Sequence, residues 1–231
     1  MVMNAPLPQS LPPLENGDRL TRAEFERRYA ASPQIEKAEL IEGVVYLASP
    51  NRFLHHAVPH SHLSGWLGTY ATYTPGTLSG IEPTVRLDLE NEFQPNIVLL
   101  LEEAVGGHTQ VTEEGYLEGV PELVVEIAAS SAAIDLGHKQ RAYRRSGVRE
   151  YIVWQSFEQQ LAWFHLVDGD YQLLQPDDAG VIRSQQFPGL WLAVEALCCN
   201  QMAEVLKVLQ AGIDSPEHAE FVAKLELQRS V

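Results

Sequence analysis

Three strongly apolar runs constrain the fold of this chain more than any other feature: residues 96–101 (NIVLLL), 122–127 (ELVVEI) and 151–155 (YIVWQ). Apolar residues occupy both alternating positions of each run, which is typical of strands covered on both faces of a sheet. Between the last two runs, a helix is predicted from Asp135, as its N-cap, to Ser146. A strand–helix–strand crossover places this helix against a mixed sheet, so the predicted fold class is α/β.

Shorter signals predict further elements on either side of this core. They are a helix from Thr21 to Ala31, a hairpin turning at Glu42-Gly43, a helix over 55–70, short strands near 77–81 and 84–89, a hairpin turning over 167–170, a helix near 193–211 and a last helix capped by Ser215. We therefore expect a flexible Pro-rich tail (1–18), one domain (19–195) and a C-terminal helical extension (196–231).

The formal net charge of −15 limits how this chain can bind nucleic acid. A protein that holds DNA through a broad basic surface has the opposite charge, so any DNA contact is expected to be local and sensitive to salt. No apolar run approaches the roughly 20 residues of a membrane helix, and the first residues do not read as a secretory signal. The only cysteines, Cys198 and Cys199, are adjacent; we expect them in the core of a cytoplasmic protein without membrane contact.

Two charged residues stand where an apolar core is predicted. A buried carboxylate is costly unless it is paired or bound to a cation, so Glu126 is either a strand-end residue bonded to a local Arg or Lys, or part of a site. Lys139 lies on the helix stripe that should face the sheet. There it either covers apolar surface with its methylene chain or folds back over the end of the Glu126 strand. Glu39, in an alternating strand, is a third acidic candidate, although a lone glutamate in a hairpin is usually solvated.

Other catalytic patterns are weak or missing from the sequence. His56 and His60 have the four-residue spacing that puts two zinc ligands on one helix face. No glutamate follows His56, and no cysteine or third histidine stands at ligand spacing, so a zinc site is disfavoured. The sequence also contains no Gly-rich phosphate loop of the Walker or dinucleotide kind and no nucleophile elbow.

Several segments together resemble a widespread bacterial family of restriction-endonuclease-like proteins within the PD-(D/E)XK nuclease superfamily, long catalogued as a domain of unknown function. They are AELIEGVVYLASP, TVRLDLENEFQPN, GYLEGVPELVVEIAASSAAIDLGHKQRAYRRSGVREYIVW and FPGLWL, in one collinear order between about residues 20 and 195. The resemblance implies a restriction-endonuclease-like core, with a mixed central β-sheet flanked by helices. The N-terminal helix and hairpin and the C-terminal helices are then additions to that core.

The resemblance also implies which residues form the site. The Pro-Asp of the family falls on Pro95-Asn96, its acidic strand residue on Glu126 and its early glutamate on Glu39. The implied ligands of Mg²⁺ or Mn²⁺ are Glu39, Asn96, Glu126 and the backbone carbonyl of Ile127. Asn96, Glu126 and Lys139 are the implied catalytic residues. The strict motif would have lysine where this chain has Ala128, and the lysine is expected from the following helix instead.

Asn96 departs from the family pattern, because its amide oxygen is neutral where the family has a carboxylate. Mg²⁺ is commonly held by only one or two carboxylates, so losing one should weaken its binding. Two functions stay open. One is a Mg²⁺-dependent DNA endonuclease attenuated by Asn96. The other is a catalytically inactive nuclease-fold protein kept for binding or regulation, and a homodimer is compatible with both.

Overall fold

The computed structural model describes residues 11–230, so the first ten residues of the predicted tail lie outside the described residues. Later residues of that predicted tail pack against the N-terminal hairpin. The Gly17 backbone N–H donates to the carbonyl of Val45 at 2.8 Å, and Leu14 is buried beside Phe25.

A six-stranded mixed sheet forms the centre of the molecule, in the order β12-β11-β10-β9-β6-β3. Its strands are β3 (Thr77–Ile81), β6 (Ile97–Leu101), β9 (Leu123–Ala128), β10 (Glu150–Gln155), β11 (Gln160–Val167) and β12 (Asp170–Leu173). Strands β9 and β10 are parallel, and every other neighbouring pair is antiparallel. The predicted crossover, the mixed sheet and the α/β class are therefore confirmed.

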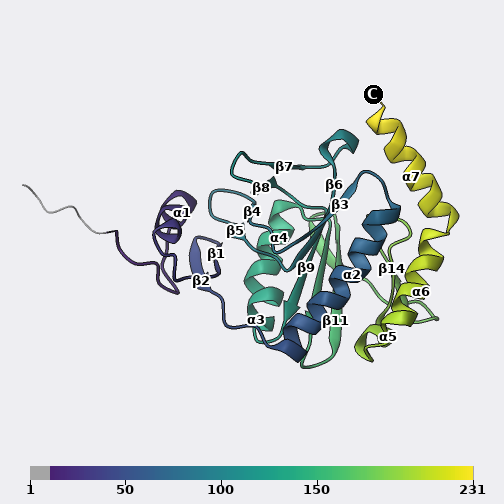
Figure 1. Ribbon diagram of the computed structural model, residues 1–231, viewed down its shortest axis with the longest axis horizontal. Helices are drawn as coiled ribbons and strands as arrows, with labels where there is room; N and C mark the ends of the chain where they lie inside the picture. The colour runs from purple at the N-terminus through teal and green to yellow at the C-terminus, as the bar shows by residue number, and fades with distance from the viewer. Residues whose placement is uncertain (1–10, 231) are drawn as a thin grey trace, which may run out of the picture.

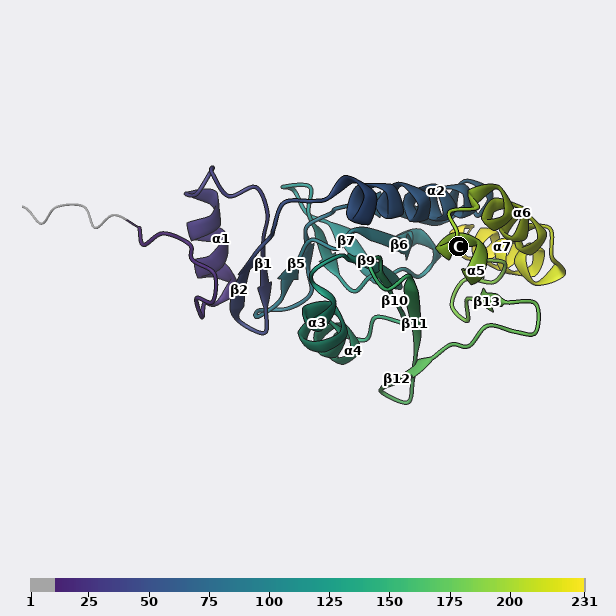
Figure 2. The ribbon, with the colours of Figure 1, turned by 90° about the horizontal axis from the view of Figure 1, so that it is seen from below.

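Helices cover both faces of this sheet, as Figure 2 shows, with α2 on one face and α3 and α4 on the other. The helices are α1 (Arg22–Ala30), α2 (Val58–Tyr73), α3 (Ala132–Ile134), α4 (Gln140–Ser146), α5 (Val194–Cys198), α6 (Met202–Ile213) and α7 (Pro216–Arg229). Two π-helical turns, η1 (Phe53–Ala57) and η3 (Asp135–Lys139), lead into α2 and α4, and η2 (Glu103–Val105) is a 3₁₀ turn. The core between the sheet and helices α2, α5 and α6 is apolar, and it includes Trp66, Trp163 and Leu209.

A second six-stranded sheet, in the order β2-β1-β5-β4-β8-β7, lies on the N-terminal side, beside α1 (Figure 1). Its strands are β1 (Ala38–Ile41), β2 (Val44–Leu47), β4 (Val85–Arg86), β5 (Glu92–Phe93), β7 (Thr109–Val111) and β8 (Leu117–Gly119), and β13 (Val181–Arg183) pairs separately with β14 (Trp191–Ala193). The predicted hairpin at Glu42-Gly43 thus forms one edge of a sheet. Both turn residues have positive φ, 51° and 74°, as a tight hairpin requires.

Three sequence predictions were wrong in detail. Asp135 is not an N-cap, because the helical path begins three residues earlier and the Asp135 side chain turns inward, where it accepts from the Ser131 hydroxyl. The helix predicted near 193–211 is two helices, separated at Asn200, which has φ 56°. Cys199 is exposed rather than in the core.

Within residues 11–230, no helix is both long enough and apolar enough to span a membrane.

Candidate active site

The strand register brings Asn96 and Glu126 to the same end of the central sheet. Asn96 directly precedes β6, and Ile97 pairs with Val125, one residue before Glu126 on β9. Both side chains are almost fully buried, with 4% of Asn96 and 3% of Glu126 exposed. The two site residues that sequence analysis placed on separate strands are therefore neighbours.

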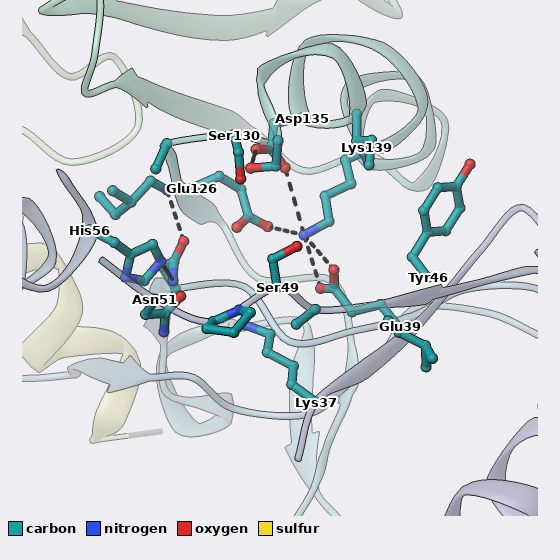
Figure 3. Close-up of a pocket in the computed structure, with 18 of the residues that line it drawn as sticks. Lys37, Glu39, Tyr46, Ser49, Asn51, His56, Glu126, Ser130, Asp135 and Lys139 are labelled. Carbon is teal, nitrogen blue, oxygen red and sulfur yellow. Dashed lines mark hydrogen bonds and ion pairs between the residues drawn. The ribbon is translucent and has the colours of Figure 1, made fainter. Parts of the chain in front are cut away.

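Lys139 reaches this end of the sheet from the helical segment that follows β9. Its ammonium lies 2.9 Å from Glu126 Oε1, 2.8 Å from Glu39 Oε2 and 3.8 Å from Asp135 Oδ1. Figure 3 shows the lysine side chain extending from its helix toward these three carboxylates. The structure thus brings together the predicted Glu39, Glu126 and Lys139, and it adds Asp135.

The cluster carries more negative than positive charge, and burial decides how that charge is distributed. Burial raises the pKa of Glu126 to about 7, against the opposing effect of the Lys139 ammonium, and burial also raises the pKa of Asp135. Burial alone would lower the pKa of Lys139, but the carboxylates of Glu126, Glu39 and Asp135 outweigh it and raise that pKa well above its usual range. Lys139 therefore stays protonated near neutral pH, while part of the surplus negative charge is removed by protonation of carboxyl groups.

Two residues that the sequence analysis did not assign to the site hold this cluster in place. The Tyr143 hydroxyl, one turn after Lys139, donates to Glu126 Oε1 at 3.1 Å. Asp135, one turn before Lys139, accepts from the Ser131 hydroxyl. The i, i+4 spacing of Asp135, Lys139 and Tyr143 on one helical face was the signal available in the sequence.

The Asn96 amide is occupied by protein partners on both sides. Its Oδ1 accepts a 2.8 Å hydrogen bond from the Ile127 backbone N–H, and its Nδ2 donates to Nε2 of His56 at 3.1 Å. Burial lowers the pKa of His56, which favours the neutral ring that can accept this bond. An aspartate here would present a second oxygen where Asn96 presents an N–H donor.

The two histidines considered for zinc both serve Asn96 instead. His60 Nε2 donates to the Asn96 backbone carbonyl at 2.9 Å, while His56 accepts from the Asn96 side chain. Across residues 11–230, no three or more His, Cys, Asp or Glu side chains are arranged to hold a metal ion by themselves. The arginines of α4 pair with carboxylates outside this cluster: Arg141 and Arg145 pair with Glu42, and Arg144 pairs with Asp170.

The cluster around Lys139, together with Asn96 and His56, lines a cavity of about 310 Å³ whose wall also includes Lys37 and Arg52. Oxygen atoms are the ligands that suit a hard divalent cation, and one carboxylate oxygen of this cluster is available. Glu126 uses only Oε1 for Lys139 and Tyr143, so its Oε2 is the oxygen left for another partner. Three carboxylates surround the single ammonium of Lys139, while the whole cavity lining holds three carboxylates and three cationic side chains, Lys37, Arg52 and Lys139. The residues therefore fit a divalent ion held through one carboxylate, with Asn96 contributing less than an aspartate would.

Comparison with known proteins gives two matches. A family model described as "Uma2: Putative restriction endonuclease" matches residues 22–195. A solved structure from Anabaena variabilis, described as "a putative nuclease belonging to DUF820", has a TM-score of 0.58 and 11% sequence identity; the match covers 75% of this chain and 96% of that one. At this identity the likeness shows the fold alone. No curated protein matches the chain.

The family match covers most of the chain, and it includes every residue of the cluster around Lys139. Together with the mixed sheet and the nuclease-like fold, it confirms the resemblance to restriction-endonuclease-like proteins. This chain belongs to the Uma2 family, whose model is described as "Putative restriction endonuclease".

Proposed function

We propose that this chain is a Mg²⁺-dependent DNA endonuclease whose activity is attenuated by Asn96. One observation carries the proposal: the Lys139 ammonium lies 2.9 Å from the buried Glu126 carboxyl at the wall of a cavity. A cation and a carboxylate held in this way can serve phosphodiester hydrolysis, in which negative charge develops on the phosphate.

Glu126 Oε2 and the Ile127 carbonyl are the groups that would hold the divalent ion. Glu39 and Asn96 could also contribute, but each would first have to give up a contact it makes with the protein. When bound, Mg²⁺ or Mn²⁺ supplies an activated water and stabilises the charge of the transition state. Binding there would also draw Glu126 toward its ionised form, since a nearby positive charge lowers a carboxyl pKa.

Lys139 is the residue that would contact the scissile phosphate. Its positive charge would stabilise the phosphate oxygens as their charge increases. Glu39 and Asp135 are positioning residues, because they hold the ammonium at the cavity wall from two sides. Tyr143 acts in the same way on Glu126, since its hydroxyl fixes Oε1 and leaves Oε2 directed elsewhere.

Asn96 attenuates this chemistry for two reasons. It removes one formal negative charge from the ligand set, which weakens attraction for a divalent ion. It also directs an N–H group at His56, so the position of a second carboxylate oxygen is taken by a donor. Metal binding by the wild type is expected to be weak rather than absent, because Glu126 and Glu39 remain.

The second candidate, an inactive nuclease-fold binding or regulatory protein, is favoured by the same side chain. Because both ends of the Asn96 amide are hydrogen-bonded to protein, the amide is well placed to stabilise the fold without any ligand. On this account Asn96 is a structural replacement for a lost catalytic residue. A homodimer would suit either function, and the acidic chain requires DNA contacts to be local in both.

Nicking of supercoiled plasmid with Mg²⁺ or Mn²⁺ separates these functions. We expect slow nicking by the wild type, faster nicking by Asn96→Asp and none by Glu126→Ala. If Asn96→Asp is inert on every DNA substrate tried while remaining folded, the endonuclease proposal fails. If wild type and Glu126→Ala nick at the same rate, the activity comes from a contaminant or another site.

A further inference from the structure

An exposed aromatic surface adjoins the cavity, on the turn that leads into α2. We define this surface as Arg52, Phe53, Leu54, His55 and Phe157. Phe53 is 74% exposed and Leu54 69% exposed, although both are large apolar side chains. Exposed apolar groups of this size, gathered on one short segment, are typical of a binding surface.

The surface is built from two distant parts of the chain. The His55 ring stacks on the Phe157 ring, with centroids 4.2 Å apart, and the Arg52 guanidinium lies 5.5 Å from the centre of the same ring. The Ser156 hydroxyl donates to the His55 carbonyl, which ties the β10–β11 turn to η1. Phe157 is therefore held by a stacked ring and a guanidinium while 43% of it stays exposed.

The same segment forms part of the cavity wall. Arg52 and His56, on either side of the exposed residues, both line the cavity that contains Glu126 and Lys139. Figure 1 shows the start of α2 and the crossover helix α3 at the same end of the sheet. A polymer with a phosphate at Lys139 would thus place its neighbouring unit near the exposed rings.

Charge decides which polymer fits. Within residues 11–230, Arg52 has no carboxylate within ion-pair distance, whereas Arg141 and Arg145 are paired with Glu42. The cations at the cavity are few, and the chain as a whole carries −15. Duplex DNA is held mainly through many phosphate contacts, while single strands are held by stacking of bases on aromatic side chains with a few cations.

We infer that this surface is a stacking platform for an unpaired base, and that the preferred substrate is single-stranded or locally unpaired nucleic acid. The inference rests on the proposed function for the position of the phosphate. The inference adds the substrate class to the proposed function. Stacking of a base on the aromatic rings compensates for the missing basic surface. Phe53 and Phe157 are binding residues for the base, and Arg52 supports both the ring of Phe157 and the adjacent phosphate.

The test measures binding of the full chain without divalent metal, so that cleavage plays no part. The probes are a short fluorescein-labelled single strand, the matching blunt duplex, and the same single strand with one 2-aminopurine, whose fluorescence is quenched on stacking. The variants are Phe53→Ala and Phe157→Ala, with Phe53→Tyr retaining a ring. Leu227→Ala, on α7 and 71% exposed, is the control for loss of an exposed apolar side chain.

We expect tighter binding of the single strand than of the duplex. Each Phe→Ala variant should bind the single strand roughly 5- to 150-fold more weakly, the cost of one lost stacking contact, and should lose the 2-aminopurine quenching. Phe53→Tyr and Leu227→Ala should match the wild type. With Lys37, Arg52 and Lys139 as the phosphate contacts, log K should fall with log salt at a slope of roughly −2.1.

Equal binding of duplex and single strand, or Phe→Ala variants that bind like the wild type, would overturn the inference. So would a wild type that self-associates and becomes monomeric in Phe53→Ala with oligonucleotide binding unchanged, because the surface would then be a protein contact. If the single strand binds through Phe53 and Phe157 but Asn96→Asp does not nick DNA, the nuclease proposal fails and the stacking platform stands. If nicking occurs and Phe53→Ala does not change its rate, the nuclease proposal stands and the stacking platform fails.

Discussion

Replacing Glu126 by glutamine should change how the stability of the protein depends on pH. The Glu126 carboxyl is buried, with Lys139 as the opposing cation, and with Asp135, Glu39 and Lys37 as the other charges that face it. Glutamine keeps an oxygen for Lys139 and Tyr143 but cannot ionise. The variant therefore isolates the free energy of ionising this one group.

The magnitude follows from the pKa of about 7 in the folded protein against the ordinary value of 4.5. Between these two values the unfolded chain has already released the proton and the folded protein has not. The free energy of unfolding therefore falls as pH rises through this window, and the loss is complete above pH 7. At about 1.36 kcal/mol for each pH unit, Glu126 should cost the wild type roughly 3 kcal/mol between pH 4.5 and 7.

Urea unfolding at several pH values from 5 to 8, followed by tryptophan fluorescence, measures this effect. Relative to the wild type, Glu126→Gln should gain stability steadily up to about pH 7 and then level off, by roughly 2 to 3 kcal/mol in total. The exchange of carboxyl for amide adds a constant offset, so the slope is the test. Glu204→Gln, on the surface of α6, controls for loss of a carboxylate. If the difference between wild type and Glu126→Gln does not change with pH, Glu126 ionises as an ordinary glutamate and the reasoning is refuted.

Further predictions concern the cation of the cluster and the packing of the C-terminal helices. Lys139→Met should lower the free energy of unfolding at pH 7.5 by about 3 to 5 kcal/mol, because the buried carboxylate of Glu126 and that of Glu39 lose the ammonium that pairs with them. An unchanged urea midpoint would show that the carboxyls are already neutral. Gly212→Ala should destabilise the fold by more than about 1 kcal/mol, since a Cβ there would lie 2.2 Å from the Gly189 carbonyl oxygen and 2.8 Å from the Trp191 ring. Gly65→Ala, with no atom within 4 Å of the added carbon, is its control, and equal melting temperatures for the two variants would contradict the packing argument.

The central sheet was predictable from the sequence because its three buried strands are long and continuously apolar. The parallel pairing of β9 and β10 followed from the helix between them. The second sheet was not predictable as a unit. Its strands β4 and β5 are two residues long, which is too short for any period, and their pairing depends on contacts distant in sequence.

The site was predictable where charge contradicts an apolar pattern. Glu126 and Lys139 stood out for this reason, and the structure brings them to 2.9 Å. Asp135 was misassigned because an aspartate before a helical pattern is usually a cap. Nothing in the local sequence shows that the helix begins at Ala132 and continues through a π-helical turn over Asp135–Lys139. The partners of Asn96 could not be predicted either, since His56 and Ile127 meet it only through the fold.

The central claim is that Glu126 holds a divalent ion and that Asn96 is a weaker ligand for it than an aspartate would be. Calorimetric titration with Mg²⁺ and Mn²⁺ tests this claim most directly. The wild type should bind weakly, Asn96→Asp should bind at least tenfold more tightly, and Glu126→Ala should not bind. If Asn96→Asp binds no more tightly than the wild type, or if Glu126→Ala binds as the wild type does, this end of the sheet is not a nuclease metal site.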